Sequence, residues 1–480
     1  MKYKIVFYTV GRVMLFEAAL LMIPLAVSLV FGESCAVAFI ISVLIALVPG
    51  LALTLLCRGA QKDIFIREGL AIVALSWVCI SAAGALPFVI SGEIPSYIDA
   101  FFETVSGFTT TGASILTDVE SMSRGLLFWR SLTHWLGGMG VLVFVMAVLP
   151  MSGEHSMHIM RAEVPGPTVG KLVPRARETA KILYLMYMAL TALETILLKA
   201  GGMSFFDALL HAFGTAGTGG FSTKAASVGA FNSLYAEMVI SVFMLLFSVN
   251  FNLYYLLLIG RLKDVLKNEE LHWFLAIVLF SVLTIAVNIS KMYGSFATAL
   301  RHAFFNVATI ISTTGYGTVD FNLWPQYSKW LLILLMFIGA CAGSTGGGLK
   351  VSRVVMLLKS AEAELKQMIR PRSVTRVQLE GKRVETGAVH AVSTFFVMYL
   401  MILLVCTLLI SVDGFDMETS FTGALACLSN IGPGMSLVGP TGSYSMFSAF
   451  SKIVLSLAML IGRLEIYPIL LLFSRHTWKR

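Results

Sequence analysis

Long apolar runs, separated by shorter polar stretches, dominate the pattern of hydrophobic and polar positions along this chain of 480 residues. A helix needs about 20 consecutive apolar residues to cross the hydrocarbon core of a bilayer, and most of the runs approach or exceed that length. They lie near residues 10–31, 36–57, 69–91, 125–150, 181–200, 232–260, 271–290, 327–342, 388–411 and 446–474. The pattern therefore predicts an all-α membrane protein with about ten transmembrane helices embedded in a lipid bilayer.

Four shorter apolar segments lie between some of these runs, near residues 97–108, 204–217, 295–312 and 416–430. They are too short to span a bilayer, and segments of this length are candidates for re-entrant helices. Each is followed by a loop rich in glycine or threonine and then by another long run. We therefore expect four repeats of helix, half-length helix, loop and helix, over residues 68–160, 175–268, 269–370 and 371–480. Residues 1–67 form two additional N-terminal helices in this scheme.

The distribution of charge sets the orientation of the chain. Lysine and arginine gather near residues 58–67, 161–181, 261–267 and 350–383 and at the C-terminus. All of these positions fall on one side of the ten-helix scheme, which the positive-inside rule assigns to the cytoplasm. The half-length segments and their flanking acids fall on the outer side. The basic stretch 350–383 has two open readings, a plain cytoplasmic loop or a docking surface for a cytosolic partner.

The amino-acid composition and the motifs limit the classes of function that this protein can have. The chain is 57% hydrophobic and 13% charged, whereas soluble proteins contain about 25% charged residues. Because the net charge of +8 follows from basic cytoplasmic loops, we expect no nucleic-acid partner. The chain has neither a His-Glu-x-x-His nor a Gly-x-Ser-x-Gly motif, and its histidines, including His134, His211 and His302, are scattered and favour packing roles. We expect no enzyme and no organic cofactor on this chain.

The four loops look like diverged copies of one element. They read "GFTTTGAS" with Gly112, "AGTGGFS" with Gly219, "STTGYGT" with Gly315 and "SNIGPGM" with Gly432. Non-helical backbone within a membrane is tolerated only where protein encloses it or where it lines a cavity, and glycine lets such backbone turn its carbonyls inward. A ring of carbonyls, with threonine hydroxyls, can replace the hydration shell of an alkali cation. The loops therefore predict a filter for a monovalent cation.

A second irregular element is expected beneath the filter, in "GACAGSTGGGLK" at residues 339–350. Its glycines and hydroxyl residues favour an unwound segment that lines a cavity, although a helix of loosely packed small residues is the alternative. The residues concerned are Gly343, Ser344, Thr345, Gly346, Gly347 and Gly348.

Arg463 lies inside the last apolar run, where an arginine costs about 2.5–3.5 kcal/mol on insertion scales and so needs a partner. We hypothesise that Arg463 holds the broken segment across the pore and repels cations. The alternative is a purely structural pair with a buried acid or carbonyl. Arg130, in a similar apolar setting, is interpreted as structural.

Several motifs together resemble a known family. They are "SGFTTTGAS" at 106–114, "RSLTHWLGGMG" at 130–140, "TGGFS" at 218–222, "STTGYGT" at 312–318, "GSTGGGLKVSR" at 343–353 and "GRLEIYP" at 462–468. The chain resembles the Trk/Ktr/HKT superfamily of potassium transporters, and its two extra N-terminal helices resemble the TrkH/TrkG branch. The resemblance implies one pore per chain built from four pseudo-symmetric units, a homodimer, and a location in the cytoplasmic (inner) membrane. It also implies a cytosolic TrkA-like regulatory subunit, with ATP/ADP or NAD bound only by that partner.

The resemblance also implies which residues form the filter, with potassium as the transported ion. The expected filter residues are Thr110, Thr111, Gly112, Thr218, Gly219, Thr313, Thr314, Gly315, Asn430, Ile431 and Gly432. Potassium itself is expected at Thr111, Gly112, Thr218, Gly219, Thr314, Gly315, Ile431 and Gly432. In this family a glycine rather than a serine in the first loop favours potassium over sodium. Because the third loop has the pair Gly315 and Gly317 whereas the fourth has Asn430, Ile431 and Pro433, we expect one regular ring of carbonyls and weaker selectivity than in a filter with four identical loops.

The expected function is potassium uptake through a gated, channel-like pore. Symport coupled to protons or sodium is the alternative, and the sequence shows no chain of buried acids that would serve as a proton relay. A transporter of anions would need basic residues in the substrate path, and the four loops have none at the filter.

Overall fold

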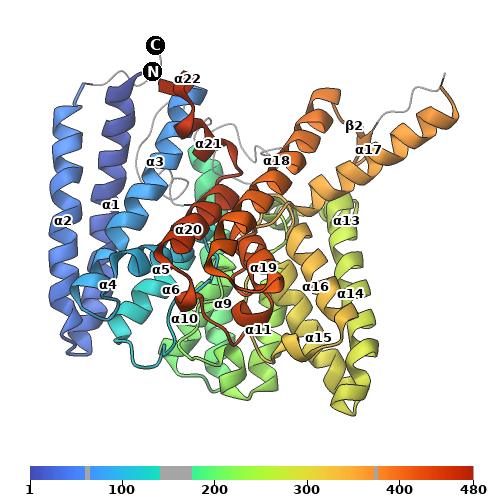
Figure 1. Ribbon diagram of the computed structural model, residues 1–480, viewed down its shortest axis with the longest axis horizontal. Coiled ribbons are helices and arrows are strands. Elements are labelled where there is room, and N and C mark those ends of the chain that lie inside the picture. Colours follow the sequence, from blue (N-terminus) through green and yellow to red (C-terminus); the bar gives the residue numbers. More distant parts are fainter. Residues whose placement is uncertain (60–64, 141–175, 372–376, 479–480) are drawn as a thin grey trace.

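The computed structural model describes residues 1–59, 65–140, 176–371 and 377–478 (Figure 1). These residues are mostly helical, and the strands in the described ranges are one short antiparallel pair, β1 (Gln378–Leu379) and β2 (Lys382–Arg383). The two termini lie together at one end of the molecule, where the Tyr3 hydroxyl donates to the Trp478 carbonyl at 2.5 Å. The all-α membrane class predicted from the sequence is confirmed.

Six helical segments among the described residues are long and apolar enough to cross a membrane. They are α1 (Tyr3–Val30), α2 (Cys35–Leu56), α3 (Ile66–Gly84) continued by α4 (Leu86–Ile90), α9 (Ala176–Ala200), α14 (Glu269–Tyr293) and α18 (Thr386–Ile410). The first two pack closely along each other at one side of the molecule (Figure 1). Helix α1 also packs against α3 and α6, and the division of the chain into two additional helices and four units stays a prediction.

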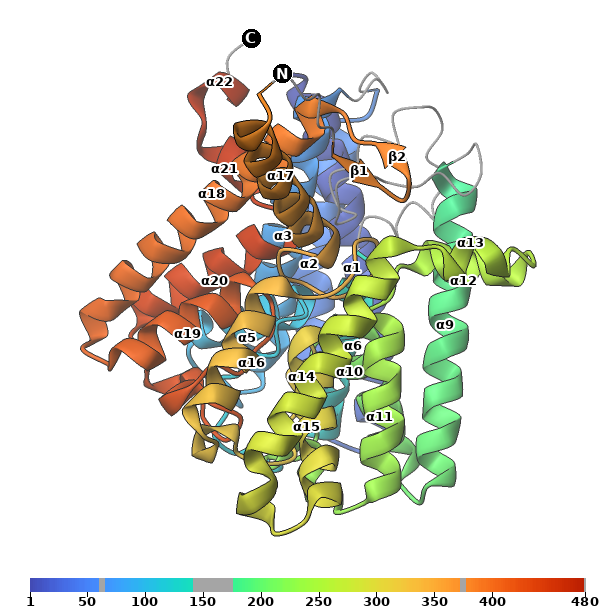
Figure 2. The same cartoon turned by 90° about the vertical axis from the view of Figure 1, so that its right-hand side faces the viewer.

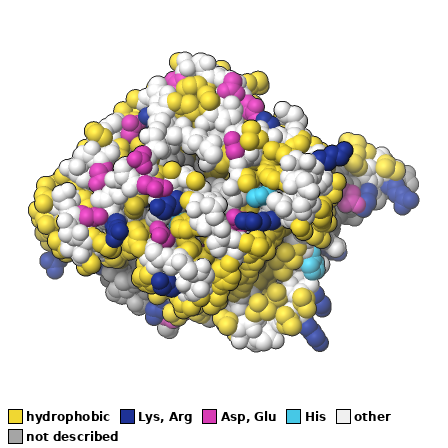
Figure 3. All heavy atoms as spheres, turned by 90° about the horizontal axis from the view of Figure 1, so that it is seen from below, with side chains coloured by type: hydrophobic (Ala, Val, Ile, Leu, Met, Phe, Trp, Pro, Cys, Tyr) yellow, Lys and Arg dark blue, Asp and Glu magenta, His cyan; other side chains and the backbone are white. Residues whose placement is uncertain are grey.

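The four half-length segments are short helices: α5 (Tyr97–Phe108), α10 (Phe205–Gly217), α15 (Phe296–Ile311) and α19 (Met417–Leu428). Three of them begin at a side-chain cap, in which Ser96, Ser204 or Asp416 accepts a backbone N–H from the first turn, as helix N-termini require. These capped ends lie toward the face opposite the chain termini. That face carries scattered acidic side chains (Figure 3).

The described helix that follows each half-length segment is short. These helices are α6 (Arg124–Gly138), α11 (Leu234–Phe247), α16 (Gln326–Ile338) and α20 (Ala449–Arg463), and each has only 13 to 15 residues. Between α11 and α12 (Phe251–Leu258) the chain bends by 91°, so that α12 and α13 (Leu262–Leu266) run across the direction of α11 and α9 (Figure 2).

The breaks correct the expected spans. The sequence predicts one break, after Ile338, and this is confirmed because residues 339–350 are not helical. Treating 232–260 and 446–474 as continuous runs was wrong, since α11 ends at Phe247 and α20 is separated from α21 (Tyr467–Phe473) by Glu465 and Ile466, both with positive φ. The later part of the run 125–150 and the basic cluster that begins at residue 161 lie outside the described residues up to residue 175.

The remaining elements are peripheral. Helix α17 (Val351–Ile369) projects from the body of the molecule (Figure 1), and α22 (Arg475–Trp478) ends the described chain. Short 3-10 turns shape the outer loops, at Ser227–Phe231, Phe321–Leu323, Ser411–Asp413, Ser436–Val438 and Tyr444–Met446. The expected boundaries of the four repeats stay a prediction.

Candidate ion filter and gate

The four half-length helices end in the same backbone motif. Just beyond the end of each helix, a single residue adopts the left-handed backbone conformation. These residues are Thr110, Thr218, Thr313 and Asn430, with φ of 55°, 55°, 59° and 56°. The N–H of the next residue then donates to the carbonyl five residues earlier, at 2.8 or 2.9 Å, in all four loops. This is the hydrogen bond of a Schellman C-cap. Four loops of different sequence therefore leave their helices along one path.

The left-handed residues are unusual because glycine normally occupies this position. A residue with a side chain costs about 1–2 kcal/mol there, and two of the four side chains make hydrogen bonds to other elements that glycine could not make. The Oγ1 of Thr313 accepts the N–H of Gly347 at 2.6 Å. The amide nitrogen of Asn430 donates to Thr111 Oγ1 at 2.9 Å and to the Met459 carbonyl at 3.0 Å. The strained positions thus connect the loops to each other and to the segment beneath them.

Two residues after each left-handed residue stands a glycine with positive φ. These glycines are Gly112, Gly220, Gly315 and Gly432, with φ of 77°, 79°, 86° and 95°. The sequence alignment placed Gly219 in this set, and the structure corrects it by one residue. Gly219 instead corresponds to Thr111, Thr314 and Ile431, because it provides the N–H of the C-cap hydrogen bond. The adjacent pair Gly219–Gly220 made both registers compatible with the sequence.

The glycines close the four loops into a ring. A Cβ placed on Gly112 would collide with the carbonyl oxygen of Gly219, and one on Gly220 would collide with that of Thr314. A Cβ on Gly315 would collide with the carbonyl oxygen of Ile431, and one on Gly432 would lie 2.6 Å from that of Thr111. Each loop therefore contacts the next one: the first contacts the second, the second the third, the third the fourth, and the fourth the first. Only glycine fits at these four contacts.

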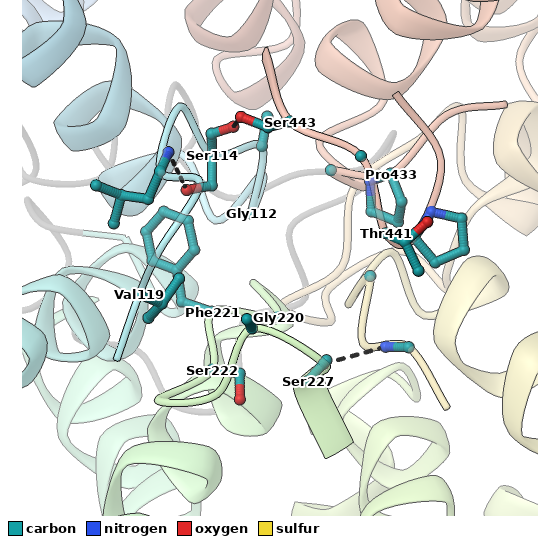
Figure 4. A pocket seen from close by; sticks show the side chains of 18 of the residues that line it. Gly112, Ser114, Val119, Gly220, Phe221, Ser222, Ser227, Pro433, Thr441 and Ser443 are labelled. Atoms are coloured by element: carbon teal, nitrogen blue, oxygen red, sulfur yellow. Dashed lines mark hydrogen bonds between the residues drawn. The ribbon is translucent and has the colours of Figure 1, made fainter. Parts of the chain in front are cut away.

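A cavity of about 300 Å³ lies over the ring and is lined by all four of these glycines. Figure 4 shows residues of the first, second and fourth loops around it, including Gly112, Gly220 and Pro433. Its two basic lining residues are paired with acids: Arg130 Nε lies 2.6 Å from Glu103, and Lys224 Nζ lies 3.6 Å from Glu120. The cavity is therefore a polar vestibule whose positive charges are balanced.

A stack of side chains supports the second loop. Phe221 lies between the imidazole of His134, at 4.0 Å between ring centres, and the guanidinium of Arg130, at 3.5 Å from the ring centre. His134 Nδ1 lies 2.7 Å from the Gly107 carbonyl, and His211 Nε2 lies 2.9 Å from Ser222 Oγ. His134 and His211 are hydrogen-bonded packing residues, as predicted, and Arg130, which was interpreted as structural, forms the ion pair with Glu103 given above. His302, the third of these histidines, packs on the ring of Tyr293 at 4.7 Å between centres.

The irregular segment 339–350 lies directly against the filter loops. Gly347 donates to Thr313 Oγ1, as described above, and the N–H of Gly348 donates to the Ser429 carbonyl at 3.0 Å. On its other side the N–H of Phe251 donates to the Gly343 carbonyl at 3.0 Å. The segment therefore connects the third and fourth filter loops to the break between α11 and α12. Gly343, Gly346, Gly347 and Gly348 are all so close to neighbouring atoms that a Cβ would lie within 2.9 Å of one.

Arg463 is buried, with 7% of its surface exposed, and its guanidinium donates to backbone carbonyls. Nη1 donates to the Thr345 carbonyl at 2.8 Å, and Nη2 donates to Gly138 at 2.6 Å and also to Gly137. The expected contact with the broken segment is thus present, while the contact with the end of α6 was not predicted. Glu465, two residues further on, accepts a hydrogen bond from Arg353 at 2.6 Å.

Three buried acids near these elements were not found from the sequence. Glu270, at the start of α14, accepts the N–H of Ala342 at 2.7 Å and that of Ser352 at 3.0 Å, and so joins the two ends of the segment 339–350. Glu17 on α1 and Glu194 on α9 are buried without a hydrogen-bond partner among the described residues. Glu17 and Glu194 are each a single acid in an apolar run, and such a residue can be recognised from the sequence, but its neighbours cannot.

Comparison with known proteins places this geometry among cation transporters. The family model described as "TrkH: Cation transport protein" matches residues 36–479. The chain is 37% identical to the Trk system potassium uptake protein TrkH of Salmonella typhimurium over an alignment of 485 residues that covers 100% of both chains. It is 33% identical to TrkG of Escherichia coli, covering 95% of this chain and 94% of that relative. The crystal structure of the potassium transporter TrkH from Vibrio parahaemolyticus superimposes with a TM-score of 0.90 at 32% identity, again over 100% of both chains.

Proposed function

Since the chain belongs to the TrkH family of cation transport proteins, we propose that it is a potassium uptake protein whose four loops form the ion filter. The family is one of multi-pass membrane transporters rather than enzymes, and this agrees with the apolar helices of the fold. The relatives named above are potassium uptake proteins. The observation that carries the proposal is the closed ring of contacts between the glycines and carbonyls of the four loops.

The ring provides the chemistry that potassium requires. The carbonyls of Thr111, Gly219, Thr314 and Ile431 occupy equivalent places in the four loops, and carbonyl oxygens can replace the water around an alkali cation. Carbonyls carry no net charge, which favours a monovalent ion that loses its hydration readily. The half-length helices end at the ring, so the negative ends of their dipoles lie close to the ion. Because Gly220, rather than Gly219, is the residue of the second loop that matches Gly112 in the structure, Gly220 is added to the proposed potassium ligands and Gly219 is kept.

The segment 339–350 and Arg463 are proposed to form the gate. The segment packs directly against the third and fourth loops, and the buried guanidinium binds its Thr345 carbonyl. A positive charge at this level would oppose the passage of cations. Opening would require the Thr345 contact to break or the segment to move together with Arg463.

The proposed partners are a second copy of this chain and a cytosolic TrkA-like subunit that binds ATP/ADP or NAD. Helix α17 supports pairing with a second copy, because it projects from the body of the molecule (Figure 1) and has four exposed apolar side chains. These are Leu358, Leu365, Met368 and Ile369. The basic residues of 350–383 support the cytosolic subunit, if this side faces the cytoplasm of a cell with the filter loops outside.

Transport is proposed to be driven by the membrane potential, which supplies about 2.3 kcal/mol per charge for each 100 mV. The test is uptake of radioactive rubidium by proteoliposomes at an imposed potential, with unlabelled potassium or sodium as competitor. Gly315→Ser should lose the preference for potassium because its Cβ meets the Ile431 carbonyl. Gly294→Ser is the matched control, since Gly294 also has positive φ but has no atom within 4 Å of an added Cβ. An unchanged potassium preference in Gly315→Ser would rule out this filter.

A further inference from the structure

Glu194 is a carboxyl group buried in the membrane-spanning helix α9. Its surface is 0% exposed, and neither of its carboxylate oxygens has a hydrogen-bond partner in the described part of the chain. Helix α9 packs against α10, the half-length helix of the second unit. An isolated ionised carboxylate in such surroundings is strongly disfavoured, and a group of this kind binds a proton instead.

The hydroxyl groups beside Glu194 have already used their hydrogens. Thr215, Tyr316 and Tyr187 are the polar side chains that interact with the carboxyl group. The hydroxyls of Thr215 and Tyr316 both donate to the His211 carbonyl at 2.9 Å, and Tyr187 donates to the Trp135 carbonyl at 2.9 Å. A carboxylate would therefore gain a donor only by taking the Thr215 hydroxyl away from the His211 carbonyl, whereas a carboxylic acid can donate its own proton to a hydroxyl oxygen.

The other titratable groups on the surrounding helices have partners of their own. On α10, His211 binds Ser222 and the Asp207 carbonyl, and Asp207 accepts from Thr223. On α11, Glu237 pairs with Arg301. On α12, Tyr254 donates to the Leu246 carbonyl. Neither carboxylate oxygen of Glu194 accepts a hydrogen bond from a lysine or arginine in the described part of the chain.

Glu194 lies behind two of the filter loops. The carbonyl of Thr215 accepts the N–H of Thr218 at 3.0 Å in the C-cap of the second loop. Tyr316 directly follows Gly315 in the third loop. A negative charge on Glu194 would therefore stand close behind the ring, where the low dielectric strengthens its attraction for a cation. Protonation removes that charge.

We propose that Glu194 is a proton-binding site linked to the occupancy of the filter by a cation. The inference rests on the proposed function, because it needs an ion in the ring. A proton that leaves Glu194 strengthens cation binding, and by reciprocity a bound cation favours release of the proton. The site binds and releases one proton, and no bond other than the carboxyl O–H is made or broken. The proton leaves to water and Glu194 keeps the electron pair.

The test measures potassium competition against rubidium uptake in proteoliposomes at acidic, neutral and alkaline pH. In the unmodified protein the concentration of potassium needed for half-inhibition should fall as pH rises, by at least about fivefold, the lower end of typical linkage. In Glu194→Gln it should not change with pH. Glu17→Gln is the matched control, because Glu17 is also buried and without a hydrogen-bond partner among the described residues, but lies against Gly84 of α3. This variant should keep the dependence of the unmodified protein.

A second measurement follows proton release directly, and its main arm uses the unmodified protein and so does not depend on the folding of a variant. Addition of potassium to the protein in lightly buffered detergent solution should release protons, and Glu194→Asp, which keeps the acid, should retain the release. Absence of release, or the same pH dependence in Glu194→Gln as in the unmodified protein, would overturn the proposal. If either outcome were found while the unmodified protein still preferred potassium over sodium, only the role of Glu194 would be refuted. If the unmodified protein did not distinguish potassium from sodium, the proposed filter itself would be refuted.

Discussion

Replacement of Arg463 tests whether the segment 339–350 is held closed by one charged hydrogen bond. Among its contacts with described residues, the guanidinium donates to the Thr345 carbonyl of this segment at 2.8 Å, and to the Gly137 and Gly138 carbonyls at the end of α6. A hydrogen bond to a charged group contributes about 1.5–3 kcal/mol. At about 1.4 kcal/mol for each factor of ten, its loss should shift the balance from closed to open roughly 10- to 100-fold.

The assay is rubidium uptake by proteoliposomes at a fixed potential, with no partner protein present. Arg463→Gln should raise basal uptake, because glutamine is shorter and uncharged. Arg463→Lys separates the two parts of the hypothesis. If the charge alone blocks cations, lysine should keep uptake low, and if the bond to Thr345 closes the gate, lysine should also raise it, since a single ammonium cannot reproduce the contacts of the planar guanidinium.

Arg301→Gln is the matched control for Arg463→Gln. It breaks a pair of equally short charged contacts, at 2.6 and 2.7 Å to Glu237, on a helix that does not include the gate. Uptake in this variant should stay at the basal level. If Arg463→Gln gave uptake equal to or below that of the unmodified protein while remaining folded, Arg463 would be a structural residue and not part of the gate.

Two further predictions concern the filter register and the outer end of a half-length helix. Gly220→Ala should reduce the preference for potassium over sodium in the same flux assay, because Gly220 has φ of 79° and an added Cβ meets a carbonyl of the next loop. Gly202→Ala is the control, because Gly202 has φ of 95° and open space around it, and this variant should keep the preference for potassium. Equal behaviour of the two variants would refute the corrected register. At the N-cap of α19, burial raises the pKa of Asp416, but hydrogen bonds from Thr419, from its own backbone N–H and from Ser436 together lower it more, so that its pKa in the folded protein lies below the ordinary value. The contribution of Asp416 to stability is therefore complete above about pH 3.9 and is lost as pH falls through the lowered pKa. Asp416→Asn keeps a cap acceptor but does not titrate, so its thermal unfolding temperature should decline less at acidic pH than that of the unmodified protein, and parallel declines would contradict this assignment.

The long and half-length helices could be predicted from the sequence because their signals are local. Apolar length alone separates α9 or α14 from α10 or α15, and the observed short helices match the expected segments to within a few residues. The cap at Ser204 is local as well, since its side chain and the Asp207 N–H are three residues apart.

The register of the second loop could not be fixed in the same way. Gly219 and Gly220 are adjacent, and either can be aligned with Gly112. Which one carries the positive φ depends on where α10 ends, through the hydrogen bond from the Gly219 N–H to the Gly214 carbonyl. It also depends on the Thr314 carbonyl of another loop, which excludes a Cβ at Gly220. Both are properties of the assembled ring.

The unpredicted helix breaks have the same origin in distant contacts. Backbone groups left without a partner inside a membrane cost several kcal/mol each, so a break needs a donor or acceptor from elsewhere. At the end of α11, where the sequence "FSVNF" has no glycine or proline, the Ser248 carbonyl accepts the N–H of Cys341 at 3.0 Å and the Phe247 carbonyl accepts the Thr345 hydroxyl at 3.2 Å.

The break at the end of α6 is satisfied in the same manner, by Arg463 on the Gly137 and Gly138 carbonyls. The segment 339–350 and Arg463 therefore complete the broken ends of other helices as well as closing the proposed gate. Because each break is satisfied by another unit, the breaks form together, and movement of the segment would leave the carbonyls of α11 in need of new partners. Water entering the opened pore could provide them, which connects opening of the gate to hydration of the path beneath the filter.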